Sequence, residues 1–444
     1  MGMPDVIVIG AGMAGVTAAR ELARAGVSVA VVEGSDRIGG RIYTMRDLCG
    51  EAVEAGAEFV HGVRAEFWPE VRAAGLAVRP WRTTRGMMFD VGVGARWLPL
   101  VLLHPGVWPV FTILRHVARV GPPDMSARQF IEQRGYRGRA RVMAEMTLTT
   151  HLPGTVDEIG MLGLLEDNVL RLETGLNHRV VDGYDRVTEY MAKGLDIRQG
   201  FTVQAIEWGT SSVTVRAVDG REMSARAAVC TLPFGVLKSG RVRFVPALPE
   251  SKRSTFECIE MGPVVKILLL FAERFWPEKL ASLICGRGPV TLYWPVFYGA
   301  ADKPPVLTAY CTGPRAAALG KVSEEEAVAI ALNDLRQRFP KAAPKLVAHR
   351  RIDWAADPLS CGGYTFVRPG GTGARARLAA ADTGALFWAG SATTTATIAD
   401  TVQAAFISGM RAAAEVRAFL GVGARAGQSA REAGGSYRAG TNRE

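Results

Sequence analysis

The chain has 444 residues, of which 48% are hydrophobic and 22% are charged, and its formal net charge is +10. This length and apolar content predict a folded protein with a large core and two domains. Its arginines are scattered rather than gathered into a basic block, so the positive charge does not indicate a nucleic-acid partner.

The remaining composition argues against metal, disulfide and membrane classes. The six cysteines form no C-x-x-C pair and the six histidines no H-E-x-x-H motif, so we expect no metal site and reduced thiols in a cytoplasmic protein. The opening MGMPD lacks the basic region of a signal peptide. The most apolar stretch, 97–114, is interrupted by His104, Pro105 and Pro109, which disfavours a membrane span. We expect a buried or cleft-lining pair of helices there; a surface that takes in an apolar substrate is the alternative.

The first elements along the chain are a strand, a helix and a second strand. Residues 5–10 (DVIVIG) form a short apolar run typical of a buried parallel strand, and residues 11–26 are alanine-rich with helical spacing. Residues 27–33 (VSVAVVE) repeat the strand pattern. This unit predicts an α/β protein with a parallel sheet.

The rest of the chain alternates between helical and strand patterns. Residues 65–175 are expected to be mostly helical, and residues 201–233 alternate and turn at Asp219-Gly220, as in a hairpin or meander followed by a buried strand. Further strands are expected at 264–271, 289–312 and 384–390, and further helices at 323–339 and 401–420. The Gly/Ala/Arg-rich tail, 421–444, has little to bury and is expected to be disordered.

The turn after the first strand carries a G-x-G-x-x-G pattern in VIGAGMAG. Its glycines permit a tight turn, close approach of a pyrophosphate and close helix packing; they are Gly10, Gly12 and Gly15. The helix then begins at Met13 and Ala14, where free N–H groups face an anion. Glu33 ends the second strand, where its carboxylate can accept ribose hydroxyls. The sequence therefore predicts a dinucleotide site.

The segment GSDRIGGRIYT (34–44) resembles the second signature of the FAD-binding superfamily of amine oxidases, protoporphyrinogen oxidase and carotenoid desaturases. In that superfamily the segment containing Gly40 and Arg41 lies along the cofactor, and the arginine faces the diphosphate, which suits a planar guanidinium. The resemblance runs to about residue 420 and is strongest to flavin-containing amine oxidases. It implies a Rossmann-type FAD-binding domain (1–80, 180–255 and 372–420) with an inserted α+β substrate-binding domain (81–179 and 256–371).

The segment EAGAEFVHG (54–62) resembles the ELGAxWxHG segment of polyamine and spermine oxidases, which passes beside the flavin. The resemblance implies cofactor contacts for Gly56, Ala57, Glu58 and Phe59. Amino-acid oxidases of the family usually carry an arginine-containing GAMR version that holds the substrate carboxylate, so this segment favours an amine substrate. Glu58 and His61 could bind a distal ammonium or help to deprotonate the substrate; equally, they could belong only to the flavin surroundings.

Two later segments resemble other parts of the cofactor site. Val203 and VCTLPFGVLKSGRVRFVPALPESK (229–252) match the adenine side. DWAADPLSCGGYTFVRPG (353–370) matches a Trp–Asp-Pro–Gly–Tyr segment, which implies a cofactor contact for Trp354 and an aromatic cage wall for Tyr364; a packing tyrosine is the alternative. In monoamine oxidases a cysteine just before this tyrosine bonds to FAD. Gly363 stands there, so non-covalent FAD is expected.

The segment LFWAGSATTTATIADTVQAAFISGMRAA (386–413) resembles the family's LFFAGEATS…YxGTVHGAYLSGxRAA. It implies cofactor contacts for Gly390, Ser391, Thr401 and Val402. Ser391 replaces a glutamate that contacts the ribityl–diphosphate part of FAD, which leaves a smaller, uncharged contact. Thr401 aligns with the second cage aromatic of monoamine oxidases, so a two-walled aromatic cage is in doubt.

Lys266 stands in the middle of the apolar run GPVVKILLLF (262–271). The run resembles the family strand whose lysine points at flavin N5 through a bridging water. Both faces of this strand are apolar, so we expect it to be buried; a lysine exposed at a sheet edge is the alternative.

Together these resemblances imply an FAD-dependent oxidase of a polyamine-like or other primary or secondary amine. A hydride would pass to flavin N5, the imine would hydrolyse, and O2 would reoxidise the flavin to give H2O2. The candidate catalytic residues are Lys266, Tyr364 and Thr401. Two alternatives stay open: a same-fold tailoring oxidase, desaturase or L-amino-acid oxidase of a biosynthetic pathway, and a non-catalytic flavin-binding scaffold.

Overall fold

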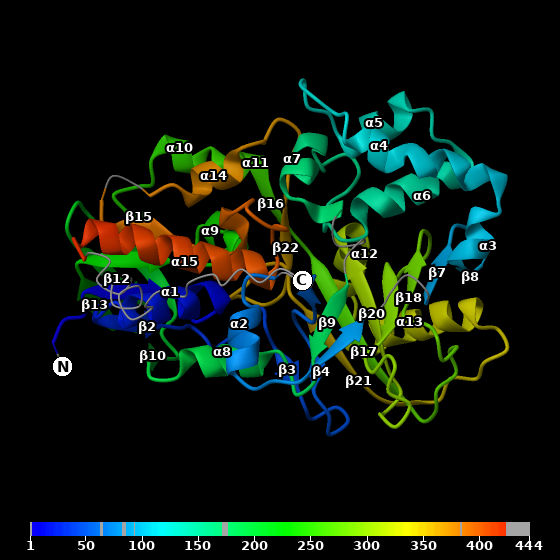
Figure 1. Cartoon of the computed structure of the whole chain (residues 1–444), viewed down its shortest axis with the longest axis horizontal. Coiled ribbons are helices and arrows are strands. Elements are labelled where there is room, and N and C mark those ends of the chain that lie inside the picture. The colour runs from blue at the N-terminus through cyan, green and yellow to red at the C-terminus, as the bar shows by residue number, and fades with distance from the viewer. Residues whose placement is uncertain are drawn as a thin grey trace, which may run out of the picture.

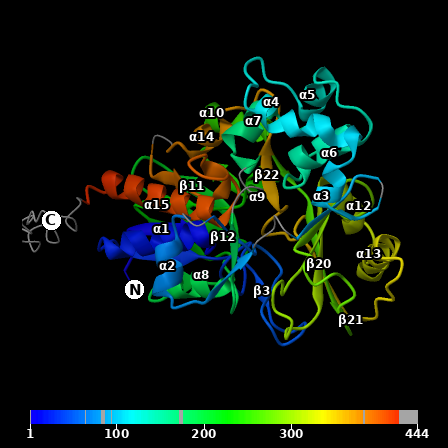
Figure 2. The same ribbon diagram turned by 45° about the vertical axis from the view of Figure 1, so that its right-hand side comes forward.

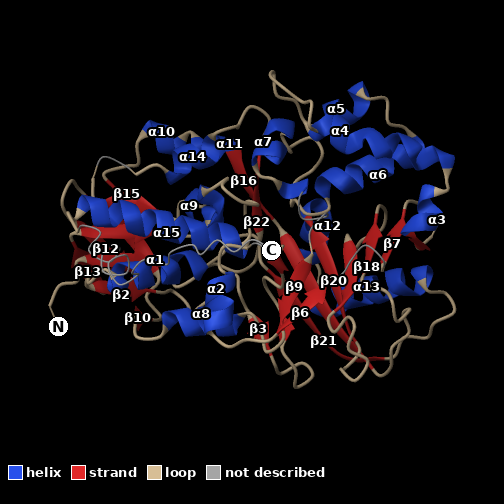
Figure 3. Cartoon of the chain, viewed as in Figure 1, coloured by secondary structure: helices blue, strands red, loops and turns tan. Residues whose placement is uncertain are grey.

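The computed structural model describes residues 2–62, 65–81, 86–92, 94–170, 176–381 and 384–422. Two large β-sheets lie in different halves of the molecule, with helices packed around them (Figures 1 and 3). The tail predicted to be disordered lies outside the described residues from position 423 onward.

The first sheet is parallel and grows from the strand–helix–strand unit at the N-terminus. Its strand order is β10-β2-β1-β14-β23, and every neighbouring pair is parallel. The strands are β1 (Val6–Ile9), β2 (Val29–Val32), β10 (Asp196–Arg198), β14 (Ala227–Cys230) and β23 (Leu386–Trp388). The central strands β1 and β14 are apolar along their whole length and fully buried. The predicted parallel sheet is therefore confirmed.

Helices α1 (Met13–Arg24) and α15 (Val402–Phe419) cover one face of this sheet and lie side by side in Figures 1 and 2. A Cβ atom at Gly409 would lie only 2.4 Å from the backbone oxygen of Ala14, so glycine is what allows the two helices to approach. Helix α8 (Asp185–Ala192) packs against α1 as well.

A four-stranded sheet, ordered β13-β12-β11-β15, shares the same hydrophobic core. Its strands are β11 (Val203–Trp208), β12 (Val213–Ala217), β13 (Glu222–Ala225) and β15 (Arg243–Val245). The turn between β12 and β13 contains Asp219 and Gly220, and Gly220 has a φ of 86°. The predicted meander and its turn are confirmed.

The second large sheet has seven strands in the order β21-β17-β20-β19-β18-β7-β8. Its strands are β7 (Met87–Asp90), β8 (Arg96–Trp97), β17 (Val264–Phe271), β18 (Ser282–Cys285), β19 (Leu292–Pro295), β20 (Val306–Thr312) and β21 (Leu346–Asp353). Strand β17 lies between β20 and β21 and is antiparallel to both. Lys266 is therefore on an interior strand, and the edge-exposed alternative is wrong.

Smaller sheets and helices complete the described part of the chain. The small sheets pair β3 (Thr44–Met45) with β4 (Val53–Glu54), β16 (Ile259–Gly262) with β22 (Tyr364–Val367), and β9 (Asn177–Val180) with β5 (Val60–His61) and β6 (Val78–Trp81). The remaining helices are α2 (Trp68–Ala73), α3 (Leu98–Leu102), η1 (Pro105–Thr112), α4 (Ile113–Val117), α5 (Ala127–Gln133), α6 (Gly138–Thr149), α7 (Met161–Glu166), α9 (Phe234–Lys238), α10 (Glu250–Arg253), α11 (Thr255–Cys258), α12 (Gly313–Gly320), α13 (Glu324–Arg338), α14 (Ala374–Ala379) and η3 (Ser391–Thr393).

Two expectations about secondary structure gain detail. The segment 65–175 contains the short strands β6, β7 and β8 beside its more numerous helices, and the strands expected within 289–312 are β19 and β20. Strands β6 and β7 pair with β9 and β18, which lie far away in the sequence. Such pairing is non-local, so a local pattern of apolar residues does not reveal it.

The apolar stretch 97–114 is only half buried. Val101, Val107 and Ile113 lie in the core, whereas Leu103 and Trp108 are 72% and 56% exposed. The expected burial of this helix pair is therefore wrong for one of its faces. Within the described ranges, no helix combines the length and apolar character that crossing a membrane requires.

The two large sheets draw their strands from different segments of the chain. All strands of the parallel sheet lie within 1–80, 180–255 and 372–420, and all strands of the seven-stranded sheet lie within 81–179 and 256–371. The division of the chain into two domains with these boundaries stays a prediction.

Candidate active site

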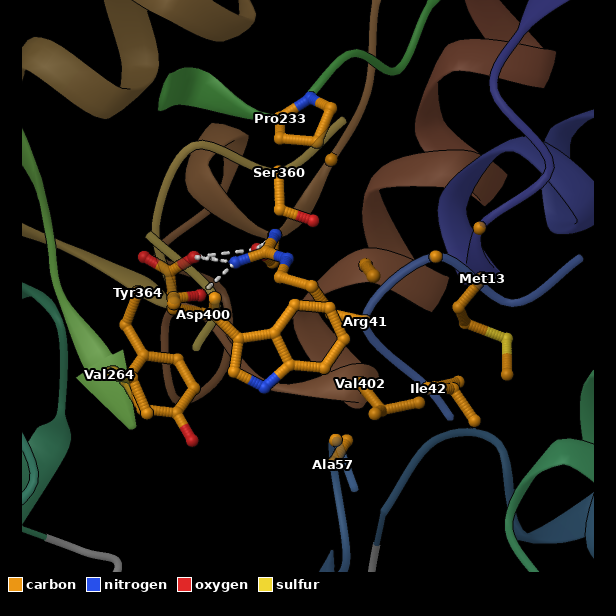
Figure 4. Close-up of a pocket in the computed structure, with 18 of the residues that line it drawn as sticks. Met13, Arg41, Ile42, Ala57, Pro233, Val264, Ser360, Tyr364, Asp400 and Val402 are labelled. Atoms are coloured by element: carbon orange, nitrogen blue, oxygen red, sulfur yellow. Dashed lines mark hydrogen bonds and ion pairs between the residues drawn. The ribbon is translucent and has the colours of Figure 1, made fainter. Parts of the chain in front are cut away.

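A cavity of about 430 Å³ is lined by residues from both large sheets (Figure 4). All but one of the residues predicted for the site line it: Gly10, Gly12, Met13, Ala14, Glu33, Gly40, Arg41, Gly56, Ala57, Glu58, Phe59, His61, Val203, Lys266, Trp354, Tyr364, Gly390, Ser391, Thr401 and Val402. The exception is Gly15. A Cβ atom there would lie 1.9 Å from the backbone oxygen of Gly10, so Gly15 allows the helix to pack on the strand.

The glycine-rich turn leaves backbone open to the cavity. Gly10 and Gly40 have φ values of 105° and 58°, which favour glycine. A Cβ atom at Gly12 would meet only the backbone oxygen of Gly39 within 4 Å, at 3.8 Å, so a side chain there would project into open space. Glu33 accepts hydrogen bonds from the backbone N–H groups of Ala11 and Ser35 at 2.7 and 2.9 Å, which fix its carboxylate beside this turn. These features fit the pyrophosphate and ribose of a dinucleotide.

Lys266 is buried, and its ammonium contacts the segment that was predicted to run beside the flavin. Its Nζ donates hydrogen bonds to the backbone oxygens of Glu54 and Gly56 at 2.8 and 3.0 Å, and to Oε2 of Glu58 at 2.8 Å. All three ammonium protons thus face protein acceptors. The expected approach to flavin N5 through a bridging water stays a prediction.

Both carboxylate oxygens of Glu58 have protein partners. Oε2 accepts from Lys266, and Oε1 accepts from Trp294 Nε1 at 2.9 Å and lies 3.3 Å from Arg179 Nε in an ion pair. Burial acts to raise the pKa of Glu58, but Lys266 and Arg179 outweigh it and hold that pKa below its ordinary value. A substrate ammonium would have to compete with these partners, and the contact expected for Glu58 stays a prediction. We refer to Lys266, Glu58, Arg179 and Trp294 as the lysine cluster.

Glu54 lies next to the lysine cluster and differs from Glu58, because no cation among the described residues lies within hydrogen-bonding distance of its carboxylate. It accepts from Thr44 Oγ1 at 2.7 Å and from the backbone N–H of Tyr184 at 2.8 Å. Burial raises its pKa from 4.5 to about 7. A raised folded-state pKa favours folding below pH 4.5, and this contribution is lost as the pH rises towards 7.

Replacing Glu54 by Gln should therefore stabilise the protein more at pH 8 than at pH 5. The raised pKa corresponds to roughly 3 kcal/mol of lost stability at high pH, which the neutral amide avoids. Thermal unfolding of both proteins at the two pH values measures the difference. An equal difference in melting temperature at pH 5 and pH 8 would contradict a raised pKa.

The two histidines of the cavity are neutral at neutral pH. His61 Nδ1 lies 3.0 Å from Asn177 Oδ1, and burial lowers the pKa of His61 to about 4. Burial likewise lowers the pKa of His151, which the sequence did not single out, to about 4. An imidazole with such a pKa is a weak base, so His61 is poorly suited to deprotonating an amine.

Thr401 lines the cavity but its hydroxyl caps helix α15. It accepts from the backbone N–H of Ala404 at 3.2 Å and donates to the backbone oxygen of Ile398 at 2.7 Å. Both bonds serve the start of the helix. The second cage aromatic has no counterpart at this position, and a catalytic role for Thr401 stays a prediction.

Aromatic rings form the wall of the cavity beside Lys266. Tyr364 begins strand β22, and its hydroxyl is hydrogen-bonded to that of Tyr310. Burial raises the pKa of Tyr364, which keeps the phenol neutral. The sequence did not identify the further wall residues, which are Trp81, Trp294 and Tyr310. They come from strands β6, β19 and β20, whose positions in the sheets a local pattern does not give.

The ring packing makes this wall continuous. The ring centroid of Phe59 lies 5.1 Å from that of Trp81 and 6.1 Å from that of Trp294. Trp294 in turn lies 5.3 Å from Tyr310, and the Lys266 ammonium lies 5.4 Å from the centre of the Trp294 ring. The wall therefore offers π faces and little polar surface to a bound molecule.

The sequence of this chain is similar to those of known flavin-dependent amine oxidases. The family model described as flavin containing amine oxidoreductase matches residues 13–88 and 122–417. Polyamine oxidase 3 of Oryza sativa subsp. japonica is 32% identical over an alignment that covers 93% of this chain and 89% of that protein.

Two solved structures share the fold. The chain matches cyclohexylamine oxidase from Brevibacterium oxydans with a TM-score of 0.83 and 22% identity, over 95% of this chain and 100% of that one. It matches wild-type putrescine oxidase bound to putrescine with a TM-score of 0.82 and 21% identity, over 94% of this chain and 99% of that one. With the glycine-rich turn and Glu33 in place for FAD, the chain belongs to the flavin-containing amine oxidoreductases, enzymes that bind FAD and act on amines.

Proposed function

We propose that this amine oxidase acts on amines with an apolar carbon skeleton, and that monoamines of this kind are better substrates than polyamines. The observation that carries the proposal is the lysine cluster: its two cations, Lys266 and Arg179, outnumber its one carboxylate, Glu58. The cluster adjoins the aromatic wall of the cavity. A second ammonium on a substrate would meet like charge there and no free acid.

The other carboxylates that line the cavity also have protein partners within the described part of the chain. Glu33 accepts from two backbone N–H groups, and Asp357 accepts from Ser360 Oγ at 2.7 Å and from the N–H of Leu359 at 3.0 Å. Asp167 and Asp400 both pair with Arg375. Burying an ammonium without a partner costs several kcal/mol, which is more than the stabilisation that a cation–π contact with an aromatic ring provides.

The same arrangement disfavours an amino acid as substrate. A substrate carboxylate needs a cation at the aromatic wall, and Lys266 is already bound to Glu58 at 2.8 Å. Arg179, the cation in excess, is paired with the same Glu58 and lies outside the residues that line the cavity. The L-amino-acid oxidase alternative therefore has less support than an amine oxidase.

FAD, when bound, supplies the acceptor that takes a hydride equivalent from the carbon beside the amine nitrogen and passes the electrons to O2, which gives H2O2. The aromatic wall holds the carbon skeleton and excludes water from it. The oxidised substrate is an imine, which water hydrolyses to a carbonyl compound and ammonia, or an amine where the substrate is a secondary amine. Lys266 keeps a positive charge fixed at the cavity wall, where it favours the reduction of O2.

The FAD is proposed to be held without a covalent bond. Gly363, rather than a cysteine, precedes Tyr364, so this position offers no thiol to the flavin. Cys361, two residues earlier, lies outside the residues that line the cavity, and its Sγ contacts the backbone oxygen of Pro358. Denaturing the protein should release all of the flavin into the supernatant.

Steady-state H2O2 release tests the substrate class. We expect kcat/KM for benzylamine or cyclohexylamine to exceed that for putrescine or spermidine by at least about a hundredfold, the size expected for an unpaired buried ammonium. An L-amino acid such as phenylalanine serves as the third arm and should give no turnover. Equal or higher kcat/KM for spermidine would contradict the proposal in favour of a polyamine oxidase.

A further inference from the structure

Arg41 reaches across the cavity to two residues near the start of helix α15. Its Nη2 donates a hydrogen bond to Ser391 Oγ at 2.9 Å, and its Nη1 lies 3.8 Å from Asp400 Oδ1 (Figure 4). The Ser391 hydroxyl donates in turn to the same Asp400 oxygen at 2.6 Å. Nη1 also donates a hydrogen bond to the backbone oxygen of Gly363 at 2.5 Å. Arg41 is therefore linked to the Asp400 carboxylate by a long ion pair and, through hydrogen bonds, by Ser391.

The other side of Asp400 faces a buried network. Its Oδ2 accepts from the backbone N–H of Thr365 at 3.1 Å, from the Thr365 hydroxyl and from Arg375 Nη1 at 3.2 Å. Arg375 is fully buried and makes a two-pronged pair with Asp167, with distances of 2.5 and 2.8 Å. Asp400 thus lies between two guanidinium groups. That of Arg375 is held by Asp167, and that of Arg41 is partly exposed at the cavity.

The backbone at this position is unusual for a residue with a side chain. Asp400 has a φ of 53°, in the left-handed region that favours glycine. In the motif YxGTVHG quoted above, the residue before the threonine is glycine, and Asp400 occupies that place. In the same motif a glutamate stands where this chain has Ser391. Compared with the motif, this chain lacks a carboxylate at position 391 and has one at position 400. The Ser391 hydroxyl donates a hydrogen bond to the Asp400 carboxylate.

We propose that Asp400 is the acid that positions Arg41 towards the phosphate part of the cofactor. Asp400 does so in place of a glutamate at position 391, and Ser391 relays the contact. The proposal rests on the predicted contact of Arg41 with the FAD diphosphate, and it is independent of which amine is oxidised.

The charges explain why Asp400 is needed. Burial acts to raise the pKa of Asp400, but Arg375 and Arg41 outweigh it and hold that pKa below its ordinary value, so the carboxylate is ionised. Without this charge, the two guanidinium groups would face each other across a neutral group and repel. Arg375 is held by Asp167, whereas the Arg41 side chain is 26% exposed. Arg41 is therefore the group that would move.

Titration of FAD into the apoprotein tests this role. Asp400→Asn and Asp400→Gly should each raise the FAD dissociation constant about tenfold or more, as expected for loss of a charge-assisted contact. The exchange variant, Ser391→Glu with Asp400→Gly, should restore affinity to within about threefold of the parent. If the single variants fail to fold, the FAD affinity of the exchange variant relative to the parent tests the role of Asp400.

Two further measurements separate positioning from a structural role. In an Arg41→Gln background, Asp400→Asn should cause no additional loss of FAD affinity, because Asp400 acts through Arg41. Asp124 is the matched control: it accepts backbone N–H groups from Met125, Leu162 and Gly370 and does not line the cavity. Asp124→Asn should lower the melting temperature and leave FAD affinity unchanged.

Three results would overturn the proposal. The first is an Asp400→Asn variant that binds FAD as tightly as the parent. The second is an equal loss of FAD affinity on Asp400→Asn with and without Arg41, which would assign Asp400 a purely structural role. The third is an exchange variant that binds FAD no better than Asp400→Gly does. Because FAD affinity is measured without amine, none of these results bears on the substrate class.

Discussion

Replacing Lys266 by Met should slow the reoxidation of reduced flavin by O2, or overall turnover, by at least about tenfold. Lys266 is 3% exposed, lines the cavity and holds its ammonium in place through three protein acceptors. A buried, fixed cation stabilises negative charge that develops on oxygen far better than a solvated one does. Methionine keeps the approximate shape and removes only the charge and the donors.

Stopped-flow measurement of both half-reactions tests this expectation. Because Lys266→Met also leaves Glu58 without its closest cation, Glu58→Gln and the double variant are the necessary controls. The double variant should regain stability lost by Lys266→Met but remain slow with O2. Unchanged rates in both half-reactions of the single variant would remove Lys266 from the chemistry.

Replacing Arg375 by Met should destabilise the folded protein by about 3–5 kcal/mol, the usual cost of breaking a buried ion pair from one side. Arg375 is fully buried between Asp167 and Asp400, and both carboxylates are buried as well. Burial raises the pKa of Asp167 even with Arg375 present, so loss of the guanidinium leaves two carboxylates with little compensation.

Urea denaturation measures this loss. Arg350 is the matched control, because its ion pair with Asp47 is 3.1 Å long but exposed on both sides, and Arg350→Met should cost less than about 1 kcal/mol. Adding Asp167→Asn to Arg375→Met should recover part of the lost stability. A loss of less than about 1 kcal/mol on Arg375→Met would show that the buried network does not stabilise the fold.

The parts of the fold that depend on local pattern could be predicted from the sequence. The apolar runs of β1 and β2 and the glycines between them indicated the parallel sheet and the dinucleotide turn, because strand burial and turn geometry act over a few residues. The burial of Lys266 followed from the apolar character of both faces of its strand. The strands within 65–175 were missed because their partners lie far along the chain.

The same distinction holds for the site. Resemblance placed almost all of the predicted residues on one cavity, but it did not give their partners. The sequence indicates that Glu58 lies beside the flavin, but it does not show that β17 brings Lys266 to within 2.8 Å of Glu58. Thr401 was carried over by alignment alone, and its hydroxyl caps a helix. Asp400 supplies a carboxylate close to Ser391 through a side-chain hydrogen bond between residues nine positions apart. A local sequence pattern does not reveal such a contact.

We propose above that the lysine cluster and the aromatic wall select apolar monoamines for oxidation by the bound flavin. The most direct test is anaerobic mixing of the purified, FAD-loaded protein with single amines while the visible absorption of oxidised flavin is followed. We expect benzylamine or cyclohexylamine to bleach the flavin within one turnover and spermidine to do so far more slowly. Bleaching by spermidine as fast as by the monoamines, or no bleaching by any amine, would contradict the account.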